Sequence, residues 1–392
     1  MNTASTPNAR STSSARPGVT GTRSGDGPLL SISDYSVHLH APRGIVRAVD
    51  GVSLTLARGR TLAVVGESGS GKSVLFRSLL GLLPQAAVAR RTGEAFFAGT
   101  DLTALDEKGL RGLRGRRIGL VFQDPMTALN PVLPVWRQLA LPLRRHLGLR
   151  RTAARTRAVE LLDAVGIPDP VRRADQYPVQ MSGGMRQRVM IALALSCDPE
   201  LIVADEPTTA LDVTVQAQIL GLLDQLRAER GLGLILISHD LGVVADHSDD
   251  VLVMYAGRQA ERGPTGTVLA TPRMPYTRAL LDAAPTLHGV RGGRLAAITG
   301  QPPDLTRTPD ACAFAARCPG VREHCHTERP SLTAVESGSP QAAACWYPVH
   351  SAAEPVASGA GPVPSAVEPV PSAAGPVPDP QDPTVTQEGS PA

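Results

Sequence analysis

The stretch Gly66-Glu67-Ser68-Gly69-Ser70-Gly71-Lys72-Ser73 decides the fold of this chain, because it matches the phosphate-binding pattern G-x-x-x-x-G-K-[ST] in full. The apolar run Leu62–Val65 precedes it and the helical pattern Lys72–Leu82 follows it, as the motif requires. Glycines let backbone N–H groups surround phosphate oxygens, and the helix adds the positive end of its dipole. We predict that the stretch binds ATP, with Lys72 on the β- and γ-phosphates and the Ser73 hydroxyl on Mg²⁺. The alternative, a Gly/Ser turn without a ligand, does not explain why a strand pattern precedes the stretch and a helical pattern follows it.

Two adjacent carboxylates, Asp205 and Glu206, follow the apolar strand pattern Leu201–Ala204. Without the phosphate-binding loop, they would be interpreted as a surface acidic pair at a strand end. With the loop, a buried strand that carries Asp at its carboxyl end is the arrangement that ligates Mg²⁺, so we assign Asp205 to the metal. Glu206 is placed one residue on, where it can activate the attacking water as a general base.

The composition limits the partners of the chain. Its 392 residues carry 39 basic and 36 acidic side chains, and this net charge of +3 gives no electrostatic footprint for nucleic acid. No stretch approaches the ~20 apolar residues that cross a bilayer, and the N-terminus lacks a basic-then-apolar signal pattern. We expect the protein to stay in the cytoplasm, so that another chain supplies the membrane part of any membrane process.

Short strand patterns alternate with helical patterns, which predicts an α/β domain with a largely parallel sheet over residues 29–265. The expected strands are Leu29–Leu39, Val46–Leu56, Leu62–Val65, Glu94–Phe97, Ile118–Phe122, Leu201–Ala204, Leu232–Ile237 and Val251–Tyr255. The expected helices are Lys72–Leu82, Ala153–Val165, Met185–Ser196 and Val213–Arg230. Residues 125–182 are rich in Arg and Leu without good strand patterns, and we expect them to form an inserted helical subdomain.

The segments outside this domain differ in composition. Residues 1–28 are rich in Ser, Thr, Gly and Arg, and residues 351–392 repeat a 14-residue unit dense in Pro, Ala and Val, so both are expected to be disordered. Residues 266–350 combine Pro-punctuated helix with a cysteine-rich segment. We expect them to form a small C-terminal domain, separate from the nucleotide site.

A third motif, Met181-Ser182-Gly183-Gly184-Met185-Arg186-Gln187-Arg188, opens a helix and places its serine 23 residues ahead of Asp205. It resembles the signature of ABC ATPases, usually Leu-Ser-Gly-Gly-Gln, although the two methionines depart from the commonest residues. The resemblance implies that Ser182, Gly183 and Gly184 cap the ATP of a partner subunit with a helix N-terminus. Ser182 as an ordinary helix N-cap is compatible with this role.

Three further positions match the same family in the same order along the chain. Gln123, after its strand, resembles the Q-loop residue that senses Mg²⁺ and the transmembrane partner. Asp212, in Ala210-Leu211-Asp212, resembles the D-loop that acts across the dimer. His239, also after a strand, resembles the switch histidine that contacts the γ-phosphate. A lone histidine at a strand end is usually structural, but its place in an ordered set of six motifs favours the functional interpretation.

One position departs from the family. The residue that stacks on adenine is usually aromatic and lies at the end of the first strand, and here that slot falls at Leu39. Leu39 offers only apolar contact, and the neighbouring His40 is the alternative for stacking. The departure bears on nucleobase selectivity and leaves phosphate binding unaffected.

The C-terminal third resembles the ATP-binding subunits of bacterial dipeptide and oligopeptide importers, a branch that also includes nickel importers. The stretches that carry the resemblance are Pro275-Tyr276-Thr277-Arg278-Ala279-Leu280, Gly300-Gln301-Pro302-Pro303-Asp304-Leu305, Cys312-Ala313-Phe314, Arg317-Cys318-Pro319 and Cys345-Trp346. With the nucleotide motifs, it covers roughly residues 29–350.

This resemblance implies a function and a set of partners. Two ATP-binding subunits, identical or homologous, would sandwich two ATP molecules at the cytoplasmic face of the membrane. Two transmembrane permease subunits and an extracytoplasmic solute-binding protein would complete a peptide importer, with nickel or another small solute as the alternative cargo. A soluble ABC ATPase that acts on DNA or ribosomes is the remote alternative. It would predict tandem ATPase halves, a coiled coil or a basic linker, whereas this chain has one phosphate-binding loop and one signature.

Four cysteines, Cys312, Cys318, Cys325 and Cys345, are spaced C-x5-C-x6-C-x19-C, which is neither a zinc knuckle nor the bacterial ferredoxin run. In a cytoplasmic chain this clustering indicates a metal of unknown kind, and four buried reduced cysteines are the alternative. The resemblance to the peptide branch, some members of which carry a [4Fe–4S] cluster on such cysteines, favours iron–sulfur over Zn²⁺.

Overall fold

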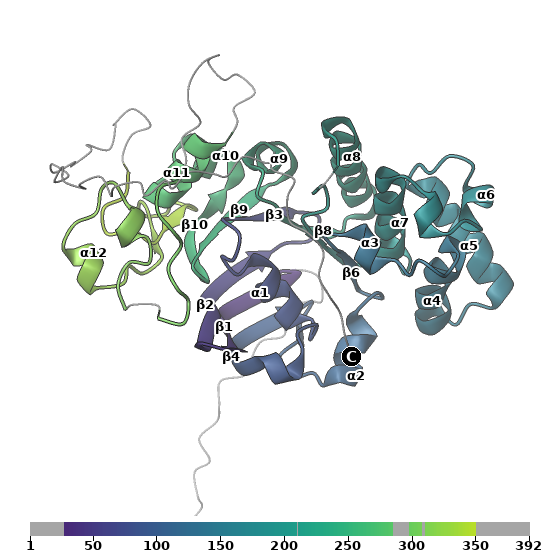
Figure 1. Cartoon of the computed structure of the whole chain (residues 1–392), viewed down its shortest axis with the longest axis horizontal. Helices are drawn as coiled ribbons and strands as arrows, with labels where there is room; N and C mark the ends of the chain where they lie inside the picture. The colour runs from purple at the N-terminus through teal and green to yellow at the C-terminus, as the bar shows by residue number, and fades with distance from the viewer. Residues whose placement is uncertain (1–26, 210, 285–297, 308–309, 350–392) are drawn as a thin grey trace, which may run out of the picture. The chain divides into compact units, whose positions relative to one another are not determined.

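An eight-stranded sheet forms the centre of the fold in the computed structural model, which describes residues 27–209, 211–284, 298–307 and 310–349 (Figure 1). Its strand order is β11-β12-β10-β9-β3-β8-β7-β6. The five strands from β9 to β6 are parallel, and β10, β12 and β11 extend one edge with antiparallel pairs. The strands are β3 (Thr61–Val65), β6 (Ile118–Val121), β7 (Leu201–Asp205), β8 (Gly233–Ile237), β9 (Asp250–Tyr255), β10 (Arg258–Pro264), β11 (Thr333–Ala334) and β12 (Ala342–Ala343).

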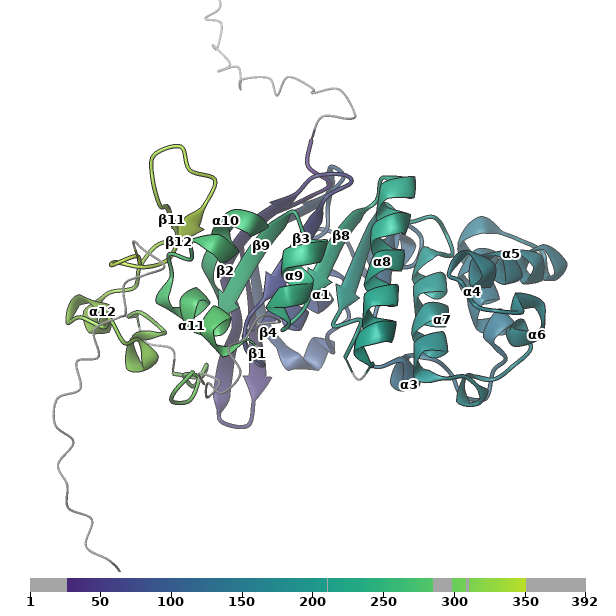
Figure 2. The ribbon, with the colours of Figure 1, turned by 90° about the horizontal axis from the view of Figure 1, so that it is seen from above.

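The middle strands β3, β8 and β7 are buried along their whole length. Strands covered on both faces form continuous apolar runs, which explains why the sequence pattern identified them. Helices α8 (Val213–Arg230) and α9 (Leu241–His247) cover one face of the sheet, as Figure 2 shows from above. Helix α1 (Lys72–Leu79) packs against the opposite face.

A second sheet lies on the far side of α1, with the antiparallel strand order β2-β1-β4-β5 (Figure 1). Its strands are β1 (Leu30–Ala41), β2 (Gly44–Leu56), β4 (Val88–Phe97) and β5 (Thr100–Asp101). The apolar residues of α1 share one core with the inner faces of both sheets. This three-layer packing fixes the start of α1, and therefore the phosphate-binding loop, between two rigid sheets. The short turn Gln85–Ala87 and helix α2 (Glu107–Leu113) flank this sheet.

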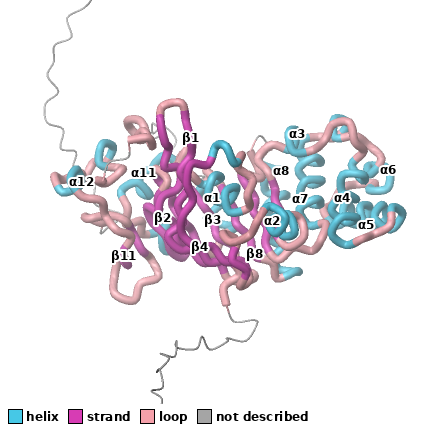
Figure 3. Tube along the Cα trace, turned by 90° about the horizontal axis from the view of Figure 1, so that it is seen from below, coloured by secondary structure: helices cyan, strands magenta, loops and turns pink. Residues whose placement is uncertain are grey.

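A helical region follows β6, and its helices α4, α5 and α6 lie beyond α7 from the sheet (Figures 2 and 3). It contains α3 (Pro125–Ala128), α4 (Val135–Leu147), α5 (Arg151–Ala164), α6 (Pro170–Ala174) and the turn Pro178–Gln180, and α7 (Gly183–Leu195) joins it to the sheet. Buried residues of α4, α5 and α7 form a continuous core with α8 and β7. Residues 125–182 therefore contain no strand, as the sequence predicted.

The C-terminal region packs on β9 and β10 instead of forming a sheet of its own. It contains α10 (Thr265–Ala270), α11 (Pro275–Ala283), the turn Ala315–Arg317 and α12 (His324–Thr327). Strand β12 pairs with β10, and the aromatic rings of Tyr255, Tyr276 and Phe314 form a shared core between the region and β9. The expected separate cysteine-rich domain is therefore not confirmed, because the described residues belong to one compact unit.

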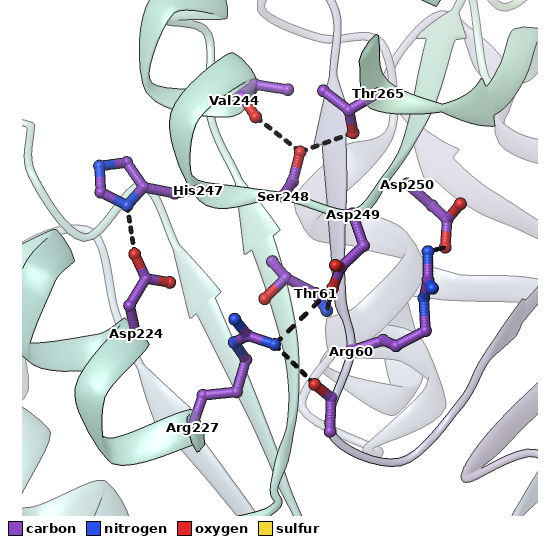
Figure 4. A network of polar contacts seen from close by, with 11 residues as sticks. Arg60, Thr61, Asp224, Arg227, Val244, His247, Ser248, Asp249, Asp250 and Thr265 are labelled. Carbon is purple, nitrogen blue, oxygen red and sulfur yellow. Dashed lines mark hydrogen bonds and ion pairs between the residues drawn. The ribbon is translucent and has the colours of Figure 1, made fainter. Parts of the chain in front are cut away.

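A polar network joins α8 and α9 to the amino ends of β3 and β9 (Figure 4). The Thr61 amide donates to Asp249 Oδ2 over 2.7 Å, and Arg227 donates to the carbonyl oxygen of Gly59 over 2.6 Å. His247 Nδ1 lies 2.5 Å from Asp224 Oδ2 and so links the two helices. These contacts stabilise the edge of the sheet formed by the amino ends of the strands. The phosphate-binding loop lies at the opposite edge, after the carboxyl end of β3.

The α/β fold predicted from the alternation is confirmed, and every expected strand and helix is present, with the ends of all but Val213–Arg230 shifted. The predicted disordered segments, apart from Gly27 and Pro28, lie outside the described residues, as does Ala210 of the D-loop motif. Across the parts of the chain that the structure describes, no helix is both long enough and apolar enough to span a membrane.

Candidate nucleotide site

The phosphate-binding loop connects the carboxyl end of β3 to the start of α1, and its geometry requires glycine. Gly66 has φ +145°, and a Cβ atom there would lie 2.2 Å from the carbonyl oxygen of Met254. Gly71, the residue before α1, has φ +101°, and its Cβ atom would lie 2.3 Å from the carbonyl oxygen of Ala48. Any side chain at either position would displace the loop, since these contacts are to backbone atoms of neighbouring strands.

Lys72 is buried at the first position of α1 and turns back over the loop. Its Nζ donates to the carbonyl oxygens of Gly66, over 2.7 Å, and Glu67, over 3.0 Å. Burial lowers the pKa of Lys72, and the carboxylates of Glu206, Asp205 and Glu67 oppose that shift. A bound phosphate would add a further negative charge beside the ammonium group and favour its protonated form.

Ser73 and Asp205 meet between α1 and the end of β7. The Ser73 hydroxyl donates to Asp205 Oδ1 over 2.6 Å, and the Arg77 guanidinium donates to Asp205 Oδ2 over 2.7 Å. Asp205 is buried, and its ion pair with Arg77 compensates its charge. The hydroxyl and carboxylate oxygens are the donors with which a protein holds Mg²⁺ beside a substrate phosphate, so this pair fits the predicted metal role. Sequence reasoning missed Arg77, whose place one turn after Ser73 was the available signal.

Glu206 lies beyond the end of β7 in a backbone conformation with φ +49°, which is uncommon for a residue with a side chain. Its Oε2 accepts hydrogen bonds from Gln123 Nε2 over 2.9 Å and from the Thr209 hydroxyl over 3.0 Å. His239 Nδ1 lies 3.4 Å from the same oxygen. The carboxylate is thus oriented by the loops that follow β6 and β8, and sequence reasoning did not identify Thr209.

The structure therefore brings six predicted residues to neighbouring positions: Lys72, Ser73, Gln123, Asp205, Glu206 and His239. They lie at or just after the carboxyl ends of β3, β6, β7 and β8, which are neighbours in the parallel sheet. The Ser70 hydroxyl in the same loop is buried and has no hydrogen-bond partner among the described residues. A polar group in that position fits a loop that receives phosphate oxygens.

The signature residues form a separate group. Ser182 caps α7 by accepting a hydrogen bond from the Met185 amide, and Asp212 caps α8 by accepting one from the Val215 amide. Ser182, Gly183 and Asp212 are exposed. Among the described contacts, none joins these three residues to the phosphate-binding loop of the same chain.

The C-terminal region touches the phosphate-binding loop directly, which corrects the expectation that it would lie apart from the nucleotide site. The Tyr276 hydroxyl accepts a hydrogen bond from the Glu67 amide over 2.8 Å. The Arg317 guanidinium binds both carboxylate oxygens of Glu67, over 2.6 and 2.9 Å. Both residues belong to the stretches that resemble the peptide importers, but no pattern in the sequence predicts this contact.

Comparison with known proteins supplies the family. The dipeptide transport ATP-binding protein DppD of Bacillus subtilis strain 168 is 47% identical over 331 residues, which cover 84% of this chain and 98% of the relative. This chain belongs to the ABC transporter ATP-binding proteins. The oligopeptide transport ATP-binding protein OppD of the same organism is 49% identical to this ATP-binding protein over 289 residues, 74% of this chain and 81% of the relative.

Family profiles and a solved structure agree with this assignment. Residues 49–209 match the family described as ABC transporter, and residues 260–325 match the one described as oligopeptide/dipeptide transporter, C-terminal region. The ATP-binding cassette MJ0796, solved as a dimer in a post-hydrolysis state with ADP and Pi, has a TM-score of 0.54 and 28% identity. That comparison covers 60% of this chain and 98% of the cassette. The ABC ATP-binding protein is accordingly an ATPase.

The four C-terminal cysteines of the ATP-binding protein are free thiols. The Cys312 amide donates to the carbonyl oxygen of Cys325 over 3.0 Å. Burial, reinforced by the other cysteines of the group, raises the pKa of Cys312 and Cys318 and raises that of Cys345 to about 12. The predicted metal site is not confirmed, because no group of three or more His, Cys, Asp or Glu side chains in the described residues is arranged to hold a metal ion.

Proposed function

We propose that this ATP-binding protein energises the import of dipeptides or oligopeptides across the cytoplasmic membrane. Its relatives are named as dipeptide, oligopeptide and peptide import ATP-binding proteins, and residues 260–325 match the C-terminal region of that transporter family. The observation that carries the proposal is the convergence of Lys72, Ser73, Asp205 and Glu206 around one loop. An ATPase site in a chain of this family implies a membrane partner that performs the transport.

The described contacts support a role for each residue. Lys72 would neutralise the β- and γ-phosphates from the loop, and Ser73 with Asp205 would hold the Mg²⁺ that accompanies ATP. Glu206 would accept a proton from the attacking water, while Gln123 and His239 orient its carboxylate. Gln123 and His239 belong to loops that would contact the γ-phosphate, so opening of the site after hydrolysis would follow from the loss of that phosphate.

A second ATP-binding subunit would complete the site. Ser182 and Gly183 are exposed at the N-terminus of α7, which suits a phosphate of a partner's ATP, and Asp212 is exposed at the N-terminus of α8. We propose that two permease subunits dock on this pair at the cytoplasmic face of the membrane and that an extracytoplasmic solute-binding protein delivers the cargo. Leu39 or His40 in β1 is proposed as the adenine contact.

Transport by the assembled complex tests this function. The chain, its permease subunits and its solute-binding protein are reconstituted in vesicles, and uptake of labelled dipeptide is measured with ATP hydrolysis. Lys72→Ala should abolish both, whereas Lys108→Ala, which removes the only other lysine, on the exposed surface of α2, should leave both near wild-type rates. Normal hydrolysis by Lys72→Ala would refute the loop assignment, and ATP-driven uptake of nickel but not of peptide would refute the cargo.

We further propose that Cys312, Cys318, Cys325 and Cys345 hold a metal centre, an iron–sulfur cluster rather than Zn²⁺. Two contacts support the proposal: the Cys312 amide donates to the carbonyl oxygen of Cys325 over 3.0 Å, and Cys312, Cys318 and Cys345 pack against the same apolar core. Metal binding would also favour the thiolate forms that burial disfavours. Anaerobically purified protein should contain iron and sulfide, and Cys318→Ser should lose both. Metal-free wild-type protein with free thiols would contradict the proposal, and a single zinc would change the metal.

A further inference from the structure

Glu67 introduces a negative charge into a loop that must bind an anion. It is the second residue of the phosphate-binding loop, and its backbone carbonyl accepts a hydrogen bond from Lys72. About a quarter of its side chain is exposed, 26%, so the carboxylate is only partly shielded by water. An uncompensated carboxylate at this place would repel the phosphates of ATP and weaken binding.

Arg317, which is 250 residues away in the sequence, compensates that charge. Its two terminal nitrogens bind the two carboxylate oxygens of Glu67 over 2.6 and 2.9 Å, which is the bidentate geometry of the strongest ion pairs. Only 3% of the Arg317 side chain is exposed. The pair is therefore neither a flexible surface contact nor strongly screened by salt.

The C-terminal region holds Arg317 in place for this contact. Its Nε donates to the carbonyl oxygen of Thr299 over 2.9 Å, and its guanidinium lies 5.9 Å from the ring centres of both Tyr255 and Phe314. The Tyr276 hydroxyl fixes the Glu67 backbone from the same region. The packed aromatic residues thus hold the charged guanidinium of Arg317 against the loop and leave it little conformational freedom.

We propose that the C-terminal region sets the affinity of the nucleotide site for ATP through Arg317, which neutralises Glu67 beside the bound phosphates. Arg317 is a positioning residue, because it acts on the loop through Glu67. The inference rests on the proposed binding of ATP by this loop. It assigns a role in nucleotide binding to a segment that lies outside residues 49–209, the part that matches the ABC transporter family.

Opposite charge changes test the proposal in the full-length chain. Equilibrium binding of a non-hydrolysable ATP analogue and of ADP, both with Mg²⁺, is measured for Arg317→Gln, Glu67→Gln and the double variant. Arg317→Gln should weaken ATP binding by about fivefold to tenfold, and Glu67→Gln should strengthen it by a similar factor, because each leaves one unpaired charge near a polyanion. The double variant should return close to the wild-type affinity. Each change should be smaller for ADP, which carries less charge.

The controls separate this proposal from the assignment of the loop. Arg273→Met removes another arginine of the same region, whose side chain contacts Glu336 and a backbone carbonyl, and it should not change ATP affinity. Lys72→Ala reports on the loop itself: if it binds ATP as well as the wild type does, the loop assignment fails. The other outcome to consider is that Lys72→Ala loses ATP binding while Arg317→Gln and Glu67→Gln both weaken ATP binding and the double variant does not recover. The contact would then be purely structural, and the charge proposal would be overturned. Should Arg317→Gln not fold, the direction of change in Glu67→Gln decides alone.

Discussion

Replacing Glu206 by Gln separates the chemical step of ATP hydrolysis from ATP binding. The substitution keeps the size of the side chain and one oxygen that can accept the hydrogen bonds from Gln123 and Thr209. The free energy of unfolding should therefore change by no more than about 1 kcal/mol. The loss of the general base should slow hydrolysis by about 10²–10⁴-fold, which raises the barrier by roughly 2.7–5.4 kcal/mol. ATP binding should persist, because the contacts of Lys72, Ser73 and Asp205 are untouched.

Single-turnover hydrolysis and nucleotide occupancy in the assembled complex measure the two effects. Glu200→Gln is the matched control, since it changes a carboxylate at the opposite end of β7 that pairs with Arg58 and Arg117. It should leave turnover unchanged and affect only stability. Near-normal turnover in Glu206→Gln would refute the reasoning and move the base elsewhere, with His239 the next candidate.

Two further predictions concern the loop and the far end of the sheet. Gly66→Ala should abolish ATP binding without unfolding the chain. Gly69→Ala is the control, since Gly69 also has positive φ but no atom lies within 4 Å of the added Cβ, and it should weaken ATP binding less. Equal effects of the two substitutions on binding would contradict the steric argument. Asp224, mainly through its hydrogen bond, raises the pKa of His247, so the pair stabilises the fold fully below the ordinary pKa of histidine and loses that contribution as pH rises through the raised pKa. Urea unfolding between about pH 5 and 9 should show a smaller fall in stability with rising pH for His247→Gln than for the wild type, and identical slopes would exclude the pair as a source of pH dependence.

The sequence predicted the central strands because burial on both faces leaves a continuous apolar run. It missed β10, whose residues Arg258 to Pro264 include two arginines and a glutamate. Charged residues are depleted in strands, but Glu261 is fully buried there and accepts hydrogen bonds from the amides of Arg273 and Met274 and from Gln341. No local pattern reveals those partners. Helix α4 was also missed as an element, since Pro142 lies inside it.

The sequence by itself determined the local chemistry of the protein: a phosphate-binding loop between a strand and a helix, and two carboxylates at the end of a buried strand. These features depend on residue types over a few positions, where backbone geometry limits the alternatives. The tertiary structure alone decided which charges meet. The pairing of Arg77 with Asp205 joins residues 128 apart, and that of Arg317 with Glu67 joins residues 250 apart. Such pairs depend on how helices and sheets pack. Packing brings together side chains that are far apart along the chain, and no periodic pattern in the sequence predicts which of them meet.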